Sequence, residues 1–314
     1  MVLLTYPWEY PQPAPVDRDN LRYYAARSSP DGPAMTDSVH SVVAAELGDD
    51  CSAWTYTLRS VDPFVRAPFE QFTEARHGGV FTFLTGQGGF LQGFLYGYPG
   101  LRWREGGPHL DPMLPPQLRG GLRVTGVRWQ GRVLDIDVRP GTTTVTLRAG
   151  AAMTVSTAQG RRTLAVGAPI ALATRTPEGN GTDAAWCRPT TATSAAPGGP
   201  PAAAVDGSPV TAWAPGTEPP AASALTVTLR AATTVGAVTA TWSGARPLAA
   251  WTLQARRAGG AWRTVATVPS SAALVDRVAV GGVVADEIRL RLPATRYGGR
   301  EPALAELVSP VSRS

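Results

Sequence analysis

Two carboxylates, Glu70 and Glu74, lie four residues apart in a segment whose composition is typical of a catalytic pocket. Aromatic residues flank both, a Gly-Gly pair follows at residues 78–79, and residues 80–98 carry no charge. A carboxyl group held in a turn beside such an apolar segment can exchange protons with a ligand, so we expect an acid at the mouth of a buried cavity. The alternative for either residue is an ordinary solvated loop carboxylate.

The tripeptide Phe72–Thr73–Glu74, followed by Phe-Leu-Thr-Gly-Gln-Gly-Gly-Phe-Leu-Gln at residues 83–92, resembles the C-terminal part of glycoside hydrolase family 65. Within that family the match is closest to the acid-trehalase-type hydrolases. The resemblance implies that Glu74 is the general base and leaves Glu70 at the surface or behind the pocket. It also implies that residues 1–100 are the C-terminal helices of an incomplete (α/α)6 catalytic barrel.

An inverting glycosidase needs a second carboxyl group about 6.5–9.5 Å from the base, because a water molecule must fit between the base and the sugar. The resemblance places that general acid upstream of residue 1. We therefore expect the chain to be a C-terminal fragment of an enzyme, or a gene model begun at an internal Met, and to be inactive alone. The chain opens without a signal-peptide pattern, and the family resemblance favours an extracellular enzyme.

The substrate that the resemblance implies is trehalose or a related α-linked glucose disaccharide, cleaved by exo-acting hydrolysis without a cofactor. Candidates for substrate binding are Gln71, Thr36 and Trp8, an aromatic residue of the kind that stacks on pyranose rings but that equally serves as packing. The alternative is a phosphorylase of the same family. Phosphorylases carry a Ser-rich phosphate-binding segment where this chain has Asp-Gly-Pro-Ala-Met-Thr at residues 31–36, so we favour hydrolysis.

Helical patterns precede and follow Glu74. Apolar residues recur at helical spacing from Met35 to Leu47, with Asp31 as the expected N-cap, and a second helix is expected from about Asp50 to Val61. Glu74 is expected in the loop that follows. Residues 80–98 contain glycines spaced four apart, at 89, 93 and 97, which predict a buried helix that another helix approaches closely and not a membrane span.

Beyond residue 100 the apolar period changes from helix to strand, as in residues 122–148. Residues 101–174 resemble the small β domain that closes family 65 enzymes. Residues 175–186 are rich in Gly, Pro and Thr and predict a linker. Residues 187–314 resemble a discoidin, or coagulation factor 5/8 type C, β-sandwich, because residues 204–213 read Ala-Val-Asp-Gly-Ser-Pro-Val-Thr-Ala-Trp. The predicted fold class is therefore multidomain α + β.

The resemblance to discoidin domains implies one structural calcium ion, with Asp206, Thr211 and Glu306 as the matching ligands. Oxygen donors from distant segments suit calcium, although Asp206 equally serves as the cap of its turn. The same resemblance leaves a third hypothesis, a non-catalytic protein that binds glycans through this domain. Exposed loop aromatics would support that hypothesis, and the candidates are Trp213, Trp242, Trp251 and Trp262.

Bulk composition argues against two other classes of partner. The net charge of +5 permits an anionic partner, but the arginines are dispersed, with no run longer than two, and nucleic-acid binding requires a clustered basic stripe. The two cysteines and three histidines are too scattered for a ligand set of metal-binding spacing. The expected partners are therefore a carbohydrate substrate and a glycan, with no nucleic acid and no membrane span.

Overall fold

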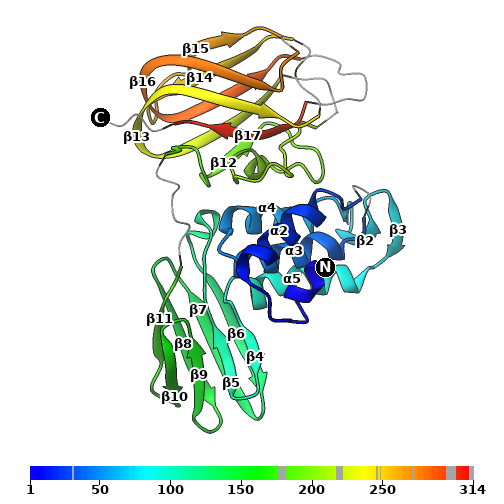
Figure 1. The fold of residues 1–314 in the computed structure, drawn as a ribbon, viewed down its shortest axis with the longest axis vertical. Coiled ribbons are helices and arrows are strands. Elements are labelled where there is room, and N and C mark those ends of the chain that lie inside the picture. The colour runs from blue at the N-terminus through cyan, green and yellow to red at the C-terminus, as the bar shows by residue number, and fades with distance from the viewer. Residues whose placement is uncertain are drawn as a thin grey trace. The chain divides into compact units, whose positions relative to one another are not determined.

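The chain forms two compact units, Met1–Pro177 and Glu178–Ser314, in the computed structural model (Figure 1). The structure describes residues 1–29, 32–175, 182–216, 222–244, 247, 249–270, 272–294 and 302–310. Each unit has its own hydrophobic core.

A cluster of helices built around α3 forms the first part of the N-terminal unit (Figure 1). Residues 42–45 at the centre of α3 are almost completely buried, because the other helices pack on it from several sides. The helices are α1 (Val2–Thr5), α2 (Ala14–Ala25), α3 (Met35–Glu46), α4 (Asp50–Arg59), α5 (Leu84–Gln92) and the π-helical turn η1 (Gly93–Gly97). The predicted helix over residues 35–47 is confirmed, with Ala34 at its N-cap, while Asp31 lies outside the described residues.

The predicted glycine stripe lets α5 and η1 approach α3 closely. A Cβ atom built on Gly89 would come within 2.6 Å of Ser38 Oγ, and one on Gly97 would lie 3.5 Å from the Cα atom of Val42. A methyl group at Gly89 would require the Ser38 side chain to shift, whereas the contact at Gly97 is an ordinary van der Waals distance. In the part of the chain that the structure describes, no helix is long and apolar enough to cross a membrane.

A three-stranded antiparallel sheet connects α4 to α5 and carries Glu74. Its strands are β1 (Val65–Arg66), β2 (Gln71–Ala75) and β3 (Gly78–Phe81), in the order β1-β2-β3. The expectation that Glu74 lies in a loop is therefore wrong, since Glu74 is the fourth residue of β2. The alternation of buried and exposed residues that marks a strand is interrupted in β2, because the neighbouring residues Phe72 and Thr73 are both buried. The sequence pattern therefore did not predict this strand.

Two four-stranded sheets complete the N-terminal unit, in the orders β10-β9-β5-β4 and β11-β8-β7-β6. A core of aliphatic side chains from both sheets holds them together. The strands are β4 (Arg102–Arg104), β5 (Gly107–Leu110), β6 (Leu122–Trp129), β7 (Arg132–Val138), β8 (Thr142–Ala149), β9 (Met153–Thr157), β10 (Gly160–Leu164) and β11 (Ile170–Ala173), with a 3-10 turn, η2, at Pro116–Leu118.

The C-terminal unit is a β structure with strand order β12-β13-β16-β14-β15, and β17 pairs with the far end of β13. Register shifts after Thr228 and Val235 divide the long β13, so its first part pairs with β12 and its second part with β17. The bounds are β12 (Thr190–Ala192), η3 (Pro201–Ala204), β13 (Ser223–Trp242), β14 (Trp251–Arg256), β15 (Arg263–Val268), β16 (Val275–Leu292) and β17 (Leu304–Val308).

Buried tryptophans organise the core of this unit. Trp213 and Trp251 are fully buried, and Trp242 and Trp251 both donate their indole N–H to Asp276 Oδ2, at 2.9 and 3.1 Å. A single buried carboxylate therefore satisfies two indole donors that the core would otherwise leave unpaired.

Both ends of the predicted linker, residues 175–186, belong to folded structure. Arg175 donates to Asp111 Oδ1 (3.0 Å) and to the carbonyl of Ala45 in the N-terminal unit, and Ala185 is fully buried in the core of the C-terminal unit. Residues 176–181 between them lie outside the described residues. The predicted linker is therefore too long at both ends, because a Gly- and Thr-rich composition does not reveal which residues hydrogen bond or pack.

Candidate functional site

Glu74 lies on β2, half-buried, next to the hairpin that leads into β3. Its carbonyl oxygen accepts a hydrogen bond from the N–H of Ala34 (2.9 Å), which ties β2 to the start of α3. Its carboxylate lies against Gly79, where a Cβ atom would stand 3.3 Å from Glu74 Oε2. Gly79 has φ +92°, so both its lack of a side chain and its backbone conformation favour glycine here.

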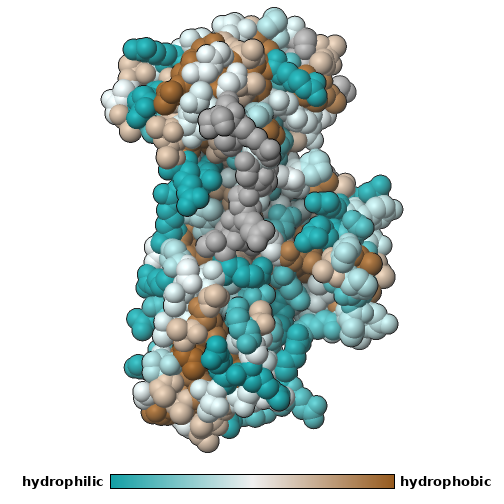
Figure 2. Space-filling view, turned by 60° about the vertical axis from the view of Figure 1, so that its left-hand side comes forward, coloured by the Kyte–Doolittle hydropathy of each residue, from teal (hydrophilic) through white to brown (hydrophobic). Residues whose placement is uncertain are grey.

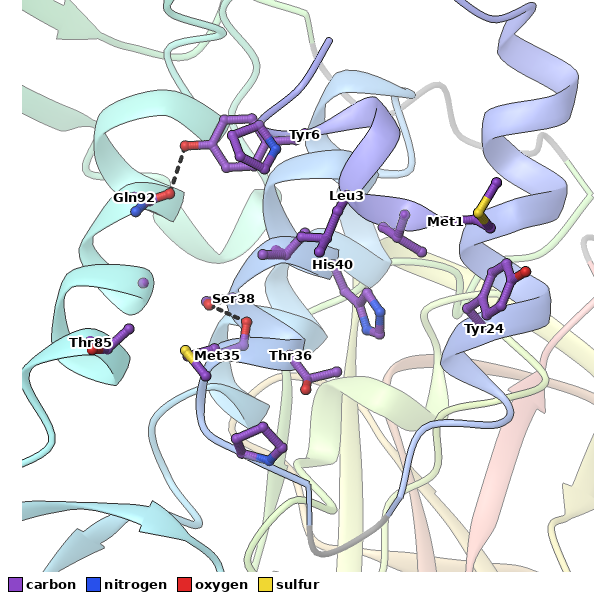
Figure 3. A pocket seen from close by; sticks show the side chains of 15 residues that line it. Met1, Leu3, Tyr6, Tyr24, Met35, Thr36, Ser38, His40, Thr85 and Gln92 are labelled. Atoms are coloured by element: carbon purple, nitrogen blue, oxygen red, sulfur yellow. Dashed lines mark hydrogen bonds between the residues drawn. The ribbon is translucent and has the colours of Figure 1, made fainter. Parts of the chain in front are cut away.

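A cavity of about 520 Å³ opens between α1, α2, α3 and α5, a size that suits a small organic ligand (Figure 3). Thr85 and Gln92 on α5 lie on one side of it and Tyr24 of α2 on the other, with α3 between them. The polar lining residues are Tyr6, Tyr24, Thr36, Ser38, His40, Thr85 and Gln92, and the remainder are mostly apolar.

A buried tyrosine fixes one wall of this cavity. The Tyr6 hydroxyl donates to Gln92 Oε1 at 2.6 Å and joins the segment after α1 to the end of α5 (Figure 3). Burial raises the pKa of Tyr6 to about 12, although the positive charge of Arg102 acts to lower it. Tyr6 is therefore a neutral hydrogen-bond donor at ordinary pH and not a proton acceptor.

The substrate-binding candidates from the sequence fall in different places. Thr36 lines the cavity. Trp8 is 78% exposed and Gln71 is exposed on β2, and neither lines it. The Glu74 side chain does not line it either, but Pro33 and Met35, the neighbours of the Ala34 that bonds to Glu74, both do. The structure thus connects Glu74 to the cavity wall through the segment 33–36.

A buried ion cluster that the sequence analysis missed lies at the start of α3. Asp37 is 7% exposed, and Arg59 Nε donates to its Oδ2 at 3.1 Å. Arg76 Nη2 lies 3.6 Å from the same oxygen, and His40 Nδ1 lies 3.4 Å from Oδ1. Burial favours a higher pKa for Asp37, but the interactions of its carboxylate with His40 and Arg59 outweigh it and hold the pKa below its ordinary value.

One sequence signal for that cluster was available. Asp37 and His40 are three residues apart on the predicted helix and so share a face. Their position inside an apolar helix marked them as buried polar residues that need partners. The partners come from residues 59 and 76, and no local pattern connects these to Asp37.

The three predicted calcium ligands of the C-terminal unit do lie near one another. The Thr211 hydroxyl donates to both carboxylate oxygens of Asp206, at 3.0 and 2.9 Å. Glu306 Oε2 accepts the N–H of Gly207 at 3.0 Å, directly after Asp206. Asp183 belongs to the same region, since its charge acts on Glu306 and both line one hollow of about 640 Å³. No local sequence pattern singled out Asp183.

The electrostatics of this group fit a hard cation. Burial raises the pKa of Glu306 to about 9, and the charges of Asp206 and Asp183 add to the effect. Glu306 Oε1 is buried without a hydrogen-bond partner. No three His, Cys, Asp or Glu side chains within the described ranges are arranged to hold a metal by themselves. A calcium ion would therefore also need hydroxyl and backbone carbonyl oxygens.

The aromatic residues considered for glycan binding are largely in the core. Trp213, Trp242 and Trp251 are at most 2% exposed, so none of them offers a ring face to a ligand. Trp262 is half-buried, with the guanidinium groups of Arg256 and Arg289 4.4 and 4.1 Å from its ring centroid. An exposed aromatic ring would favour a purely glycan-binding protein, and three of these four tryptophans do not provide one.

Models of two known domains match the chain. Residues 101–164 match the C-terminal domain of glycosyl hydrolase family 65, and residues 189–307 match the F5/8 type C domain. The chain therefore contains a C-terminal domain of the glycosyl hydrolase family 65 type, followed by an F5/8 type C domain.

Similar curated proteins are acid trehalases and a glucosidase. The chain is 42% identical over 158 residues to a cell wall acid trehalase of Arthroderma benhamiae, covering 46% of this chain and 15% of the relative. It is 42% identical over 130 residues to an acid trehalase of Emericella nidulans, covering 38% and 12%. It is 40% identical over 136 residues to the protein-glucosylgalactosylhydroxylysine glucosidase of Mus musculus, covering 43% and 19%. The matches thus span less than a fifth of each relative.

Solved structures similar to part of the chain are carbohydrate-binding modules. One is chitosan-binding module 1 of a chitosanase/glucanase from Paenibacillus sp. IK-5, with 25% identity, a TM-score of 0.36, and coverage of 40% of this chain and 96% of the module. Another is the family 32 CBM of C. perfringens NanJ, with 22% identity, a TM-score of 0.37, and coverage of 41% and 98%.

Proposed function

We propose that this chain is the C-terminal part of an inverting, exo-acting α-glucoside hydrolase whose substrate is trehalose or a related α-linked glucose disaccharide. The observation that carries the proposal is the position of Glu74. It is half-buried at the end of β2, beside a glycine that leaves room for its carboxylate, and bonded to the segment that lines the cavity. The names of the trehalase and glucosidase relatives support the substrate class.

In the proposed reaction Glu74 accepts a proton from a water molecule, which attacks the anomeric carbon from the face opposite the leaving group. A second carboxyl group, outside this chain, protonates the glycosidic oxygen. The leaving sugar departs with that proton, and the configuration at the anomeric carbon inverts. The cavity between α1, α2, α3 and α5 forms part of the sugar site, with Thr36 as a contact.

Hydrolysis is favoured over phosphorolysis by the composition of the cavity wall. Pro33 and Met35, in the segment where phosphorylases carry serines, line the cavity without a hydroxyl or cationic group, and no arginine is among the described residues that line it. The base itself is an anion, and an anion beside a phosphate oxygen would weaken its binding.

The exposed apolar residues support the proposal that further helices of a catalytic barrel pack on this unit. Most of the large apolar side chains that are exposed among the described residues belong to the first 91 residues, whereas only Val166, Leu274, Val275 and Val284 lie beyond them. Adjoining exposed apolar side chains, such as Val80 and Phe81, are typical of a surface that another element covers. On the face shown in Figure 2, hydrophobic residues gather in small groups between hydrophilic ones.

We propose that the C-terminal unit is an accessory domain that holds a structural calcium ion at Asp206, Thr211 and Glu306 and binds a glycan. The buried, unpartnered Glu306 Oε1 supports the calcium ion, which would supply the positive charge that three neighbouring carboxylates require. An extracellular location fits these features and the names of the cell wall and periplasmic relatives.

The test is an activity assay of the longer reading frame that supplies the rest of the catalytic domain, wild type beside Glu74→Gln. Trehalose and kojibiose are supplied with and without phosphate. We expect glucose without phosphate from the wild type, and at least a thousandfold loss of kcat in Glu74→Gln, because the amide cannot accept the proton. Phosphate-dependent turnover, or a fully active variant, would contradict the proposal.

A further inference from the structure

We propose that Asp37 is the positioning residue for Glu74, and that it acts through Arg76. The inference rests on the proposed function, since it assigns a role to a residue that supports the proposed base. Asp37 lies in the first turn of α3, and Arg76 follows Glu74 by two residues. The ion pair between them fixes the end of the strand that carries Glu74.

Thr73, Glu74 and Arg76 are each anchored by a contact that does not depend on pairing with β3. The Thr73 hydroxyl is fully buried and bonds to the carbonyls of Phe64 (3.2 Å) and Ala75 (2.8 Å). The Glu74 carbonyl accepts from Ala34 N–H, as described above. Arg66 donates to the carbonyl of Arg76. The backbone is therefore held on both sides of Glu74 by other elements.

Among these anchors, Asp37 alone connects three elements through charge. It binds Arg59 at the end of α4, His40 one turn along α3, and Arg76 after β2. The carboxylate is almost completely buried, and the Arg59 and Arg76 side chains are about one-fifth exposed. An ion pair so shielded from water is much less screened than one at the surface, so it resists local opening of the strand.

The packing around Phe72 strengthens the same connection. A Cβ atom on Gly86 of α5 would stand 2.7 Å from a ring atom of Phe72 and 2.9 Å from the Cβ atom of Ala34. Strand β2, the start of α3 and α5 thus meet in tight contact. If the Arg76 side chain is released, the end of the strand keeps only the backbone bonds of Glu74 to Ala34 and of Arg76 to Arg66, so it moves more freely than the half that contains Phe72 and Thr73.

The expected catalytic effect is on kcat and not on KM. A general base must hold its water within hydrogen-bond reach of the reacting carbon, and a displacement of about 1 Å can cost about a hundredfold in rate. Asp37 does not line the cavity, and of its three partners only His40 does, so its loss leaves the other lining residues, Thr36 among them, in place.

Hydrogen–deuterium exchange on this chain tests the anchoring directly. In Asp37→Asn we expect exchange in peptides covering residues 70–83 to accelerate at least tenfold, because the amide keeps the shape but loses the charge that holds Arg76. Asp17→Asn is the matched control. Asp17 is also buried in this unit, where it accepts bonds from Thr5 and Gln12 far along the chain from β2. If Asp37→Asn unfolds the unit, Arg76→Gln breaks the same pair from its more exposed side.

Assays of the longer enzyme provide the catalytic half of the test. We expect Asp37→Asn to lower kcat by about ten- to a hundredfold with KM unchanged, and Asp17→Asn to leave both unchanged. Unaltered exchange at residues 70–83, or an unaltered kcat in Asp37→Asn where Glu74→Gln is inactive, overturns this inference alone. If Glu74→Gln keeps full activity, the proposed function fails and takes the positioning role with it.

Discussion

Two glutamates that the sequence marked for different roles have contrasting surroundings. Glu74 is half-buried on a strand and lies against a glycine. Glu306 has one bonded oxygen and one buried oxygen without a partner, and two neighbouring aspartates raise its pKa further. Because burial disfavours a charge that nothing neutralises, Glu306 in the metal-free protein takes up a proton on folding.

The raised pKa of Glu306 predicts how the stability of the metal-free C-terminal unit depends on pH. The pKa of Glu306 is raised from 4.5 to about 9, so the folded state binds the proton more tightly than the unfolded state does. The free energy of unfolding should therefore fall as pH rises from about 4.5 to 9. Asp183, whose pKa burial also raises, contributes in the same direction.

Urea denaturation in EDTA at several pH values measures this dependence. Glu306→Gln is the control, because it removes the titrating group and should flatten most of the curve. Added calcium should oppose the fall, since the ion binds the deprotonated carboxylates. A stability that is constant from pH 5 to 9 in EDTA would show that Glu306 is not forced to bind a proton.

At the scale of the element, the contact of α5 with its neighbours depends on where glycine stands along the helix. Gly86 is buried and has no room for a methyl group, because Phe72, Ala34 and Phe83 lie within 3.0 Å of its Cβ position. Gly88, two residues later on the same helix, has open space at that position. The two glycines therefore separate the packing cost of a methyl group from its effect on the helical backbone.

We expect Gly86→Ala to destabilise the N-terminal unit by about 1–3 kcal/mol, because the methyl group must displace buried aromatic rings. Gly88→Ala should stabilise it by about 0.5–1 kcal/mol, since alanine favours the helix and meets no obstacle. Urea titrations of both variants beside the wild type measure the difference. Equal effects of the two substitutions would contradict the close packing of α5 on β2 and α3.

At the scale of the whole molecule, the two units differ in the interactions that stabilise each of them internally. The N-terminal unit combines apolar cores with the Asp37 cluster and the Asp111–Arg175 pair. In the C-terminal unit, three acidic side chains come close together at residues 183, 206 and 306. If calcium holds that region together, removing it should affect one unit and not the other.

Chelation should therefore loosen only the C-terminal unit. We expect EDTA to accelerate hydrogen–deuterium exchange in peptides covering residues 182–216 and 302–310, and to leave peptides of α3 unchanged. Calcium at about a hundred times its Kd should add about 2.7 kcal/mol to the free energy of unfolding of that unit. Asp206→Asn should weaken this response. Exchange that is the same with calcium and with EDTA would rule out a structural calcium ion.

Local sequence patterns predicted several helices and strands of this protein and one close contact between helices. Helical periodicity predicted α3, alternation predicted the strands of residues 122–148, and the glycine spacing predicted the close approach of α5 to α3. These features depend on residues within one or two turns or strands of one another, so the sequence shows them directly. The resemblance to family 65 and to the F5/8 type C domain was carried by short motifs, and the domain matches confirm it.

Only the tertiary structure decided which residues far apart in the sequence contact one another and which side chains are buried. It placed Glu74 on a strand, brought Arg59 and Arg76 to Asp37, and put Asp183 beside Glu306. It also buried three of the four tryptophans considered for glycan binding. Burial and ion pairing depend on the packing of residues that are 20 to more than 100 positions apart. A sequence read locally identifies the groups that need partners, but only the folded chain determines which partners they meet.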